Sequence, residues 1–131
     1  MRIASLRDND GQAAAEMALV LPILVAILLG IAQFGIAYNN YITLTDATRA
    51  GARKAAVSRF LGDGGAAAKQ TVLNAASNLK SPPLEVTVKA DNWTVPGGDV
   101  TVTATYPYSI NLFGFTVKSG SLVSTTKERL E

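Results

Sequence analysis

The sequence predicts an α+β protein in which one long N-terminal helix crosses a membrane, continues as a stalk and carries a small head. The head is expected to contain one further helix and a three-stranded antiparallel sheet. Three observations predict this layout. Residues 17–37 are almost entirely apolar, small residues recur at helical spacing through 39–61, and apolar and polar residues alternate in 84–90 and 99–108. When the spacing of apolar residues changes from a period of 3.6 residues to a period of 2, the pattern indicates a helix followed by strands.

The composition excludes several classes of function. The 131 residues contain no cysteine and no histidine, and the formal net charge is only +2. Disulfides, cysteine-based metal sites and thiol catalysis are therefore excluded, and the commonest general base and metal ligand is missing. No dense basic patch of the kind that binds nucleic acid is present. We therefore expect no enzyme, no cofactor or metal, and no nucleic-acid partner.

The apolar run from Met17 to Ala37 predicts a retained transmembrane helix. Its only strongly polar residue is Gln33, and about 20 residues suffice to cross the hydrocarbon core. A cleavable secretory signal is the alternative, but the apolar region of such signals is about 7–15 residues long and ends at a sharp small-residue cleavage site. No such site closes this run. Arginine and lysine on its two sides do not decide its orientation.

Proline and glycine occur inside the apolar run at three positions. Pro22 lies in its first third, where a membrane helix tolerates proline if neighbouring groups satisfy the freed carbonyl. Gly30 and Gly35 agree with the ordinary use of glycine in membrane helices and equally with close helix–helix packing. The sequence leaves both interpretations open.

A glutamate, Glu16, stands just before the run and follows Gly11 by five positions. Cleavage after Gly11 would make Gln12 the N-terminus and release a positively charged α-amine. An isolated buried carboxylate is strongly unfavourable, whereas in a staggered stack of parallel helices the amine of one subunit can pair with Glu16 of the next. Hydrophobic packing would supply most of the association, and the ion pair would set its register.

The alternative is that Glu16 is an ordinary first-turn carboxylate without a partner, stabilised by the helix dipole by about 0.3–1 kcal/mol. The spacing from Gly11, the polar leader and the length of the apolar run together favour the processed form. The chain then divides into a cleavable leader (1–11), a transmembrane and assembly helix (12–38), a soluble continuation of that helix (39–61) and an α+β head (62–131).

These features resemble one known family. The small residues Ala13 to Ala15, Glu16, the early Pro22 and the sequence GARKAA at 51–56 resemble, in this order, the N-terminal region of TadE/TadG-like proteins. These are the pseudopilins, or minor pilins, of tight-adherence (Flp) type IV pilus systems. The sequence VTVTATYPY at 100–108 and the terminal sequence STTKERLE resemble the family more loosely. The resemblance implies a type IV pilin-like fold, processing between Gly11 and Gln12 by an aspartic prepilin peptidase, and assembly through Glu16 and Pro22.

The resemblance also implies partners and a location. The partners are other pilin or pseudopilin subunits, the prepilin peptidase and the inner-membrane pilus assembly platform. The location is the bacterial inner membrane, with a single span and an extracytoplasmic C-terminal head, from which the subunit can enter an adhesive pilus.

The segment after the apolar run reads as a continuation of the same helix. Ala47, Gly51 and Ala55 recur every four positions and form a helix-packing ridge, while Arg49 and Arg53 lie on another face. The small-residue ridge is expected to rest on the head. A contact between subunits is the alternative.

Turn residues and periodicity predict the rest of the head. GDGG at 62–65 is expected to end the long helix, and 66–79 has the apolar spacing of a second helix, which the following prolines stop. Strands are predicted at 84–90 and 99–108, joined by a Pro-Gly-Gly turn, with a last strand within 119–130.

Two apolar features of the head have alternative interpretations. The sequence INLFGF at 110–115 is expected to be a loop folded over the core, with an exposed contact patch as the alternative. Trp93 is either a core anchor or an exposed contact, and the sequence does not decide between them.

Two functions fit these observations. The first is a processed pilin-like subunit, and the second is an uncleaved single-span membrane anchor whose extracytoplasmic head recruits partners. The state of the Gly11–Gln12 bond distinguishes the two, because an uncleaved leader would leave Glu16 without the amine.

Overall fold

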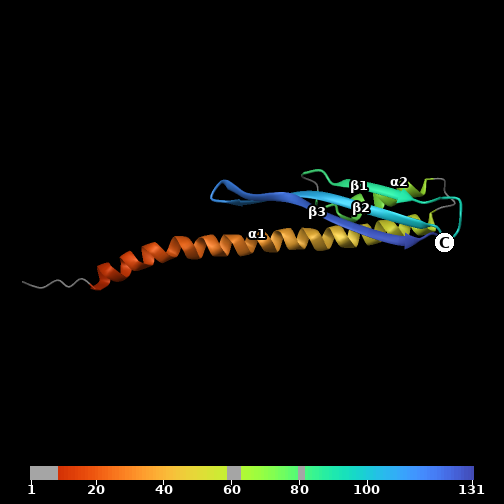
Figure 1. Ribbon diagram of the computed structural model, residues 1–131. Coiled ribbons are helices and arrows are strands. Elements are labelled where there is room, and N and C mark those ends of the chain that lie inside the picture. Colours follow the sequence, from red (N-terminus) through yellow and green to blue (C-terminus); the bar gives the residue numbers. More distant parts are fainter. Residues whose placement is uncertain (1–8, 59–62, 80–81) are drawn as a thin grey trace, which may run out of the picture.

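The computed structural model describes residues 9–58, 63–79 and 82–131 (Figure 1). Two helices precede three strands: α1 (Asn9–Val57), α2 (Gly64–Ala75), β1 (Glu85–Ala90), β2 (Asp99–Leu112) and β3 (Phe115–Arg129). The strands form one antiparallel sheet in the order β1-β2-β3. The expected α+β layout, a long apolar helix followed by a second helix and a three-stranded antiparallel sheet, is confirmed.

The first helix is continuous for 49 residues, which corresponds to about 70 Å at 1.5 Å per residue. Pro22 lies inside it, and the helix curves gently over its N-terminal part (Figure 1). It ends at Val57, earlier than the expected 61, and residues 59–62 lie outside the described part of the chain. Most of the expected leader also lies outside it, but its last residues, from Asn9, are already helical.

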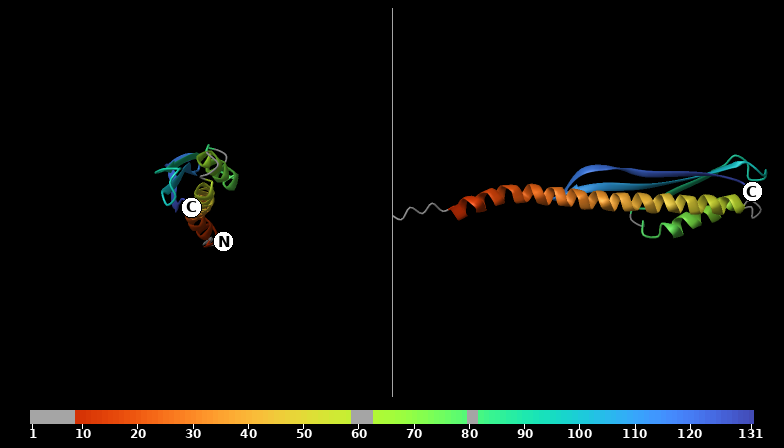
Figure 2. Two further views of the ribbon diagram at one scale, coloured as in Figure 1. Left: turned by 90° about the vertical axis from the view of Figure 1, so that its right-hand side faces the viewer. Right: turned by 90° about the horizontal axis from the view of Figure 1, so that it is seen from below.

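The C-terminal half of α1 forms one wall of the core. Viewed along its axis, α2 and the sheet lie on adjacent sides of α1 (Figure 2). Alternate residues of β2 face this helix, which is why the strand shows the period of two that its sequence predicted. The main buried cluster consists of Leu44, Ala47, Ala52, Val72, Ala76, Leu79, Val86, Val102, Ala104 and Tyr106.

A second buried cluster closes the end of the core near the C-terminus of α1. Its buried members are Ala55, Ala68, Val100 and Leu130, and Trp93 packs against them. A Cβ added to Gly64 would lie only 2.6 Å from the Trp93 ring, so the indole is seated directly on the start of α2. Trp93 is therefore a core anchor.

The hairpin of β2 and β3 is longer than the rest of the sheet. β1 pairs with β2 only as far as Thr105, and beyond it β2 pairs with β3 alone. This two-stranded part extends back along α1 toward its N-terminal half (Figures 1 and 2). The expected loop at 110–115 is wrong, because Ile110–Leu112 continue β2, Phe113 and Gly114 form the turn, and Phe115 begins β3.

Candidate functional site

The N-terminal half of α1 exposes its large apolar side chains, and only a stripe through Ala26, Gly30 and Gln33 is partly covered. The large hydrophobic side chains from Met17 to Ile36 are 37–72% exposed, and no residue in the most apolar part of the helix is fully buried. A helix with apolar side chains on nearly all sides is typical of a membrane span or of the core of a large protein. Within the described residues, α1 is the one helix that is both long enough and apolar enough to cross a membrane.

Gln12 and Glu16 lie on the same face of the first turns of α1. The Gln12 Nε2 group donates a hydrogen bond to Glu16 Oε1 at 3.1 Å, as side chains four residues apart on a helix can. Both residues are exposed, and Gly11 precedes them within the helix. Among the described residues, the ion pairs are Arg49–Asp46 and Lys127–Asp99, so no basic side chain pairs with Glu16.

The small-residue ridge of α1 lies inside the protein. Ala47, Gly51 and Ala55 are all buried, and a Cβ on Gly51 would collide with Val72 of α2. The absence of side-chain bulk along this ridge lets α2 approach α1 closely. The structure thus places these residues between α1 and the head, the first of the two contacts that the sequence allowed.

A contact that sequence reasoning missed joins the apolar run to the hairpin. Gln33 Nε2 donates a hydrogen bond to the backbone carbonyl of Asn111 at 3.3 Å. The lone polar residue of the run therefore has a partner, 78 positions away. Its isolation among apolar residues was the available signal, but nothing in the sequence indicated which group it would meet.

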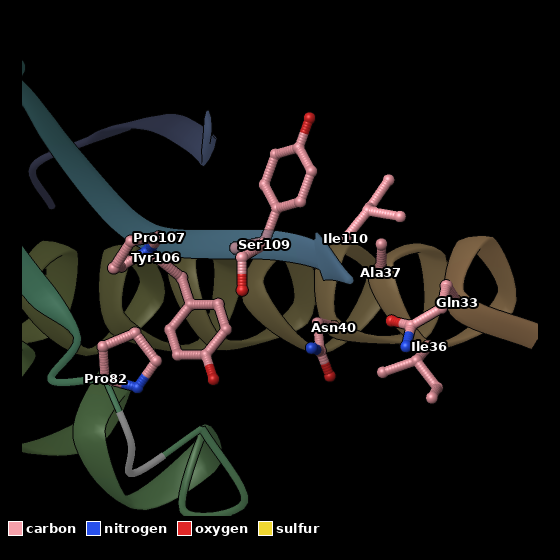
Figure 3. Close-up of a pocket in the computed structure, with 10 residues that line it drawn as sticks. Gln33, Ile36, Ala37, Asn40, Pro82, Tyr106, Pro107, Ser109 and Ile110 are labelled. Atoms are coloured by element: carbon pink, nitrogen blue, oxygen red, sulfur yellow. The ribbon is translucent and has the colours of Figure 1, made fainter. Parts of the chain in front are cut away.

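An open groove of about 200 Å³ lies beside this contact, between α1 and the edge of β2 that β1 does not cover. Figure 3 shows the ring of Tyr106 between Pro82 and Asn40, with Gln33 at the far end of the groove. The lining is aliphatic, aromatic, amide and hydroxyl, and its described residues include no carboxylate, lysine or arginine. The groove thus lacks acid–base pairs for chemistry. Over the described residues, no group of three or more acidic, histidine or cysteine side chains could hold a metal ion.

Comparison with known proteins adds one match, and it falls on this helix. The model of a family described as TadE-like protein matches from the glycine of the expected processing site into the GARKAA sequence, residues 11–53. Residues 11–53 are TadE-like. The resemblance stated from the sequence motifs is thereby confirmed over this segment. No curated protein and no solved structure matches the chain.

The TadE-like match indicates the general class of protein to which this helix belongs. It indicates a pilin-like protein associated with Tad pili, from a structural family rather than an enzymatic one. Such a protein interacts with other pilus components, and the exposed apolar half of α1 is a candidate membrane span of the kind that anchors it. The matched segment ends within α1, so α2 and the sheet lie outside it.

Proposed function

We propose that this protein is an assembly subunit, a pseudopilin, of a tight-adherence type IV pilus, and that a prepilin peptidase processes it after Gly11. One observation carries the proposal: the TadE-like match begins at Gly11 and continues along a helix whose large apolar side chains are exposed from Met17 to Ile36. A bilayer would cover this surface before assembly, and neighbouring helices would cover it in the filament. The proposed partners are other pilin subunits, the peptidase and the inner-membrane assembly platform.

The position of Glu16 supports a role in assembly. Its carboxylate lies on the face it shares with Gln12, and cleavage would place a positive α-amine on Gln12. In a stack of parallel helices this amine can meet Glu16 of a neighbouring subunit, where a charge pair in an apolar surrounding fixes register. Pro22 leaves the carbonyl of Ala18 without its helical donor, which gives the proposed assembly helix a place to bend.

Processing is tested by the intact mass and N-terminal sequence of the protein purified from its native membrane. A chain beginning at Gln12 is expected. Gly11→Leu should accumulate the precursor, whereas Gly30→Ala serves as the matched control because a Cβ at Gly30 meets nothing within 4 Å. A chain beginning at Met1 in cells that contain the peptidase would favour the uncleaved membrane anchor. A start near residue 38 would identify a secretory signal instead.

Assembly is tested by Glu16→Gln, which keeps the shape and the hydrogen bond to Gln12 but removes the charge. We expect normal cleavage and a loss of pili or of this subunit from pili, because the register-setting pair is gone. Glu85→Gln, at an exposed position of β1, is the control for loss of one negative charge. Normal incorporation of the Glu16 variant would refute the pairing.

A further inference from the structure

The turn of the β2–β3 hairpin lies beside a part of α1 that the proposed function places in the membrane. Gln33, which holds the Asn111 carbonyl, precedes the end of the apolar run at Ala37 by four residues, or about 6 Å along the helix. The hairpin turn follows Asn111 by only two residues. The head therefore does not stop at the expected membrane surface but reaches past it.

The residues at this turn are apolar and exposed. Phe113, Phe115 and Val117 are 64%, 77% and 63% exposed. The polar side chains nearby are tied to one another instead: Thr116 Oγ1 donates to Asn111 Oδ1 at 2.8 Å, and Asn111 Nδ2 donates to Ser109 Oγ at 3.4 Å. The turn thus presents apolar groups outward while it satisfies its polar ones internally.

The backbone of Phe113 has a conformation that is unfavourable for a bulky residue. Phe113 has a φ of 51°, in the left-handed region, and Gly114 follows with a φ of 83°. Two-residue hairpin turns of this kind favour asparagine followed by glycine, and a bulky residue at positive φ is rare. Strain kept at an exposed side chain points to a role for that side chain outside the fold.

Aromatic and basic residues mark the level just behind the turn. Tyr38, Tyr41 and Tyr108 line an apolar groove between α1 and the hairpin, and Lys118 lines it with them. Tyrosine is enriched where a membrane protein passes from lipid to water, and lysine extends its charged end toward the water there. In order along the molecule, the exposed apolar turn, the tyrosines and Lys118, and then the polar head match the transition from lipid to water.

We propose that the β2–β3 turn, residues Phe113, Phe115 and Val117, is a membrane-docking surface that enters the interfacial layer of the bilayer beside α1. The proposal rests on the membrane placement of α1 in the proposed function. The hairpin cannot enter the hydrocarbon centre of the bilayer, because the backbone groups at its edges are unpaired. Its apolar side chains can, however, enter the boundary between headgroups and acyl chains by about 5–10 Å.

A lipid surface fits these three residues better than a protein partner does. Phe113 lies in the turn, and Phe115 is paired with Leu112. Val117 is the residue that the strand pairing skips where the register shifts. They therefore occupy three different settings rather than the continuous face that a folded partner would match, and fluid acyl chains adapt to such an arrangement.

Because the chain contains no cysteine, single-cysteine variants of the full chain provide a direct test. We would label Phe115→Cys, Leu24→Cys and Val95→Cys with an environment-sensitive fluorophore, in vesicles of phosphatidylethanolamine and phosphatidylglycerol. Leu24 lies in the proposed span, and Val95 is an exposed apolar residue at the far end of the head. Quenching by doxyl-labelled lipid and by aqueous iodide is measured at each site.

Docking predicts that the Phe115 label is quenched by lipid whose doxyl group lies near the headgroup and is protected from iodide, whereas the Val95 label shows the reverse. A Phe115 label that behaves like the Val95 label would overturn docking and leave the membrane helix intact, provided the Leu24 label is in lipid. A Leu24 label reached by iodide would overturn the membrane placement itself. Protection from both quenchers at Phe115 would show that protein, not lipid, covers the turn.

A second variant separates docking from folding. Phe113→Asn relieves the backbone strain, so we expect a higher midpoint of thermal unfolding together with reduced lipid quenching of the Phe115 label. Val95→Asn in the same labelled background is the control and should change neither. Unchanged lipid quenching in the Phe113 variant would remove this residue from the docking surface and contradict the reason given for its strain.

Discussion

Gly51 shows, at the scale of single residues, how closely the two helices approach. A Cβ at this position would collide with Val72 and would lie 3.2 Å from the Ala68 carbonyl oxygen of α2. We expect Gly51→Ala to lower the free energy of unfolding by about 1–3 kcal/mol, because overpacking forces the helices apart. The measurement is thermal unfolding followed by circular dichroism, in detergent.

Gly35 offers the matched control on the same helix, since a Cβ there meets nothing within 4 Å. Gly35→Ala should leave the stability unchanged or raise it by about 0.5–1 kcal/mol through helix propensity. Equal losses in the two variants would show that α2 does not rest on Gly51.

The ion pair of Asp99 and Lys127 links stability to pH. Lys127 Nζ lies 2.7 Å from Asp99 Oδ2, and this hydrogen bond and charge lower the pKa of Asp99 below 3.8 and raise the pKa of Lys127 above 10.5. The contribution of Asp99 to stability is therefore present above about pH 3.8 and is lost as the pH falls through the lowered folded-state pKa. The contribution of Lys127 is lost only as the pH rises through its raised pKa.

Asp99→Asn should therefore reduce the stability slightly near neutral pH and make it less sensitive to acid than that of the unaltered protein. Urea unfolding midpoints at about pH 7 and about pH 2 measure this. The effect should be small, because the two side chains are 62% and 40% exposed and water screens their charges. An identical loss of stability on acidification in both proteins would show that the pair does not contribute.

At the scale of secondary-structure elements, a buried hydroxyl cluster joins α1 to β3. Thr48 is fully buried. Its Oγ1 donates to the Thr45 carbonyl at 2.9 Å, lies 3.0 Å from Ser124 Oγ and accepts from Thr126 Oγ1 at 3.1 Å. Thr48→Val keeps the volume but leaves the buried Ser124 hydroxyl without this partner, which should cost about 1–3 kcal/mol.

Thr71→Val is the control for that variant, because Thr71 Oγ1 donates to the Ala67 carbonyl of its own helix and, among the described residues, to no other element. Chemical denaturation should show a clearly smaller loss for Thr71→Val than for Thr48→Val. Similar losses would mean that the cost comes from the helix itself and not from the contact between α1 and β3.

Periodicity predicted the elements because each buries one face against a neighbour. The second helix shifted from 66–79 to Gly64–Ala75, and β2 and β3 proved longer than expected. The tight turn at Phe113 and Gly114 was missed, and 110–115 was expected to be a loop, because the turn lacks the usual asparagine and places Phe113 at positive φ instead. A sequence pattern cannot show such strain, since only the surroundings decide whether it is tolerated.

Sequence reasoning could propose only the part of the candidate site that depends on local spacing, and processing after Gly11 and pairing of Glu16 stay predictions. Gly11, Gln12 and Glu16 were singled out because Glu16 follows Gly11 by five positions and Gln12 by four, which is a local relation along one helix. The bond between Gln33 and Asn111 depends instead on how far the hairpin extends along α1. That length is set by strand register and by the packing of the whole head, and neither is visible in the sequence.

At the scale of the whole molecule, α1 belongs to the head as much as to the proposed membrane anchor. The main core cluster includes Leu44, Ala47 and Ala52 of this helix. We therefore expect a fragment of residues 39–131 to fold and unfold cooperatively, and a fragment of 63–131 to fail, because it lacks one wall of the core. Circular dichroism of the two fragments measures this, and cooperative unfolding of the shorter one would contradict it.

The continuity of α1 also couples the head to the anchor mechanically. An α-helix turns by about 100° per residue, and no residue between Asn9 and Val57 leaves the helix. The sheet packs on the C-terminal half, and the hairpin is bonded to Gln33. If α1 slid along a neighbouring helix and rotated to keep the same side-chain contacts, each shift by one residue would rotate the head by about 100° around the helix axis. The direction in which the head faces would thus depend on the position of α1 along its own axis.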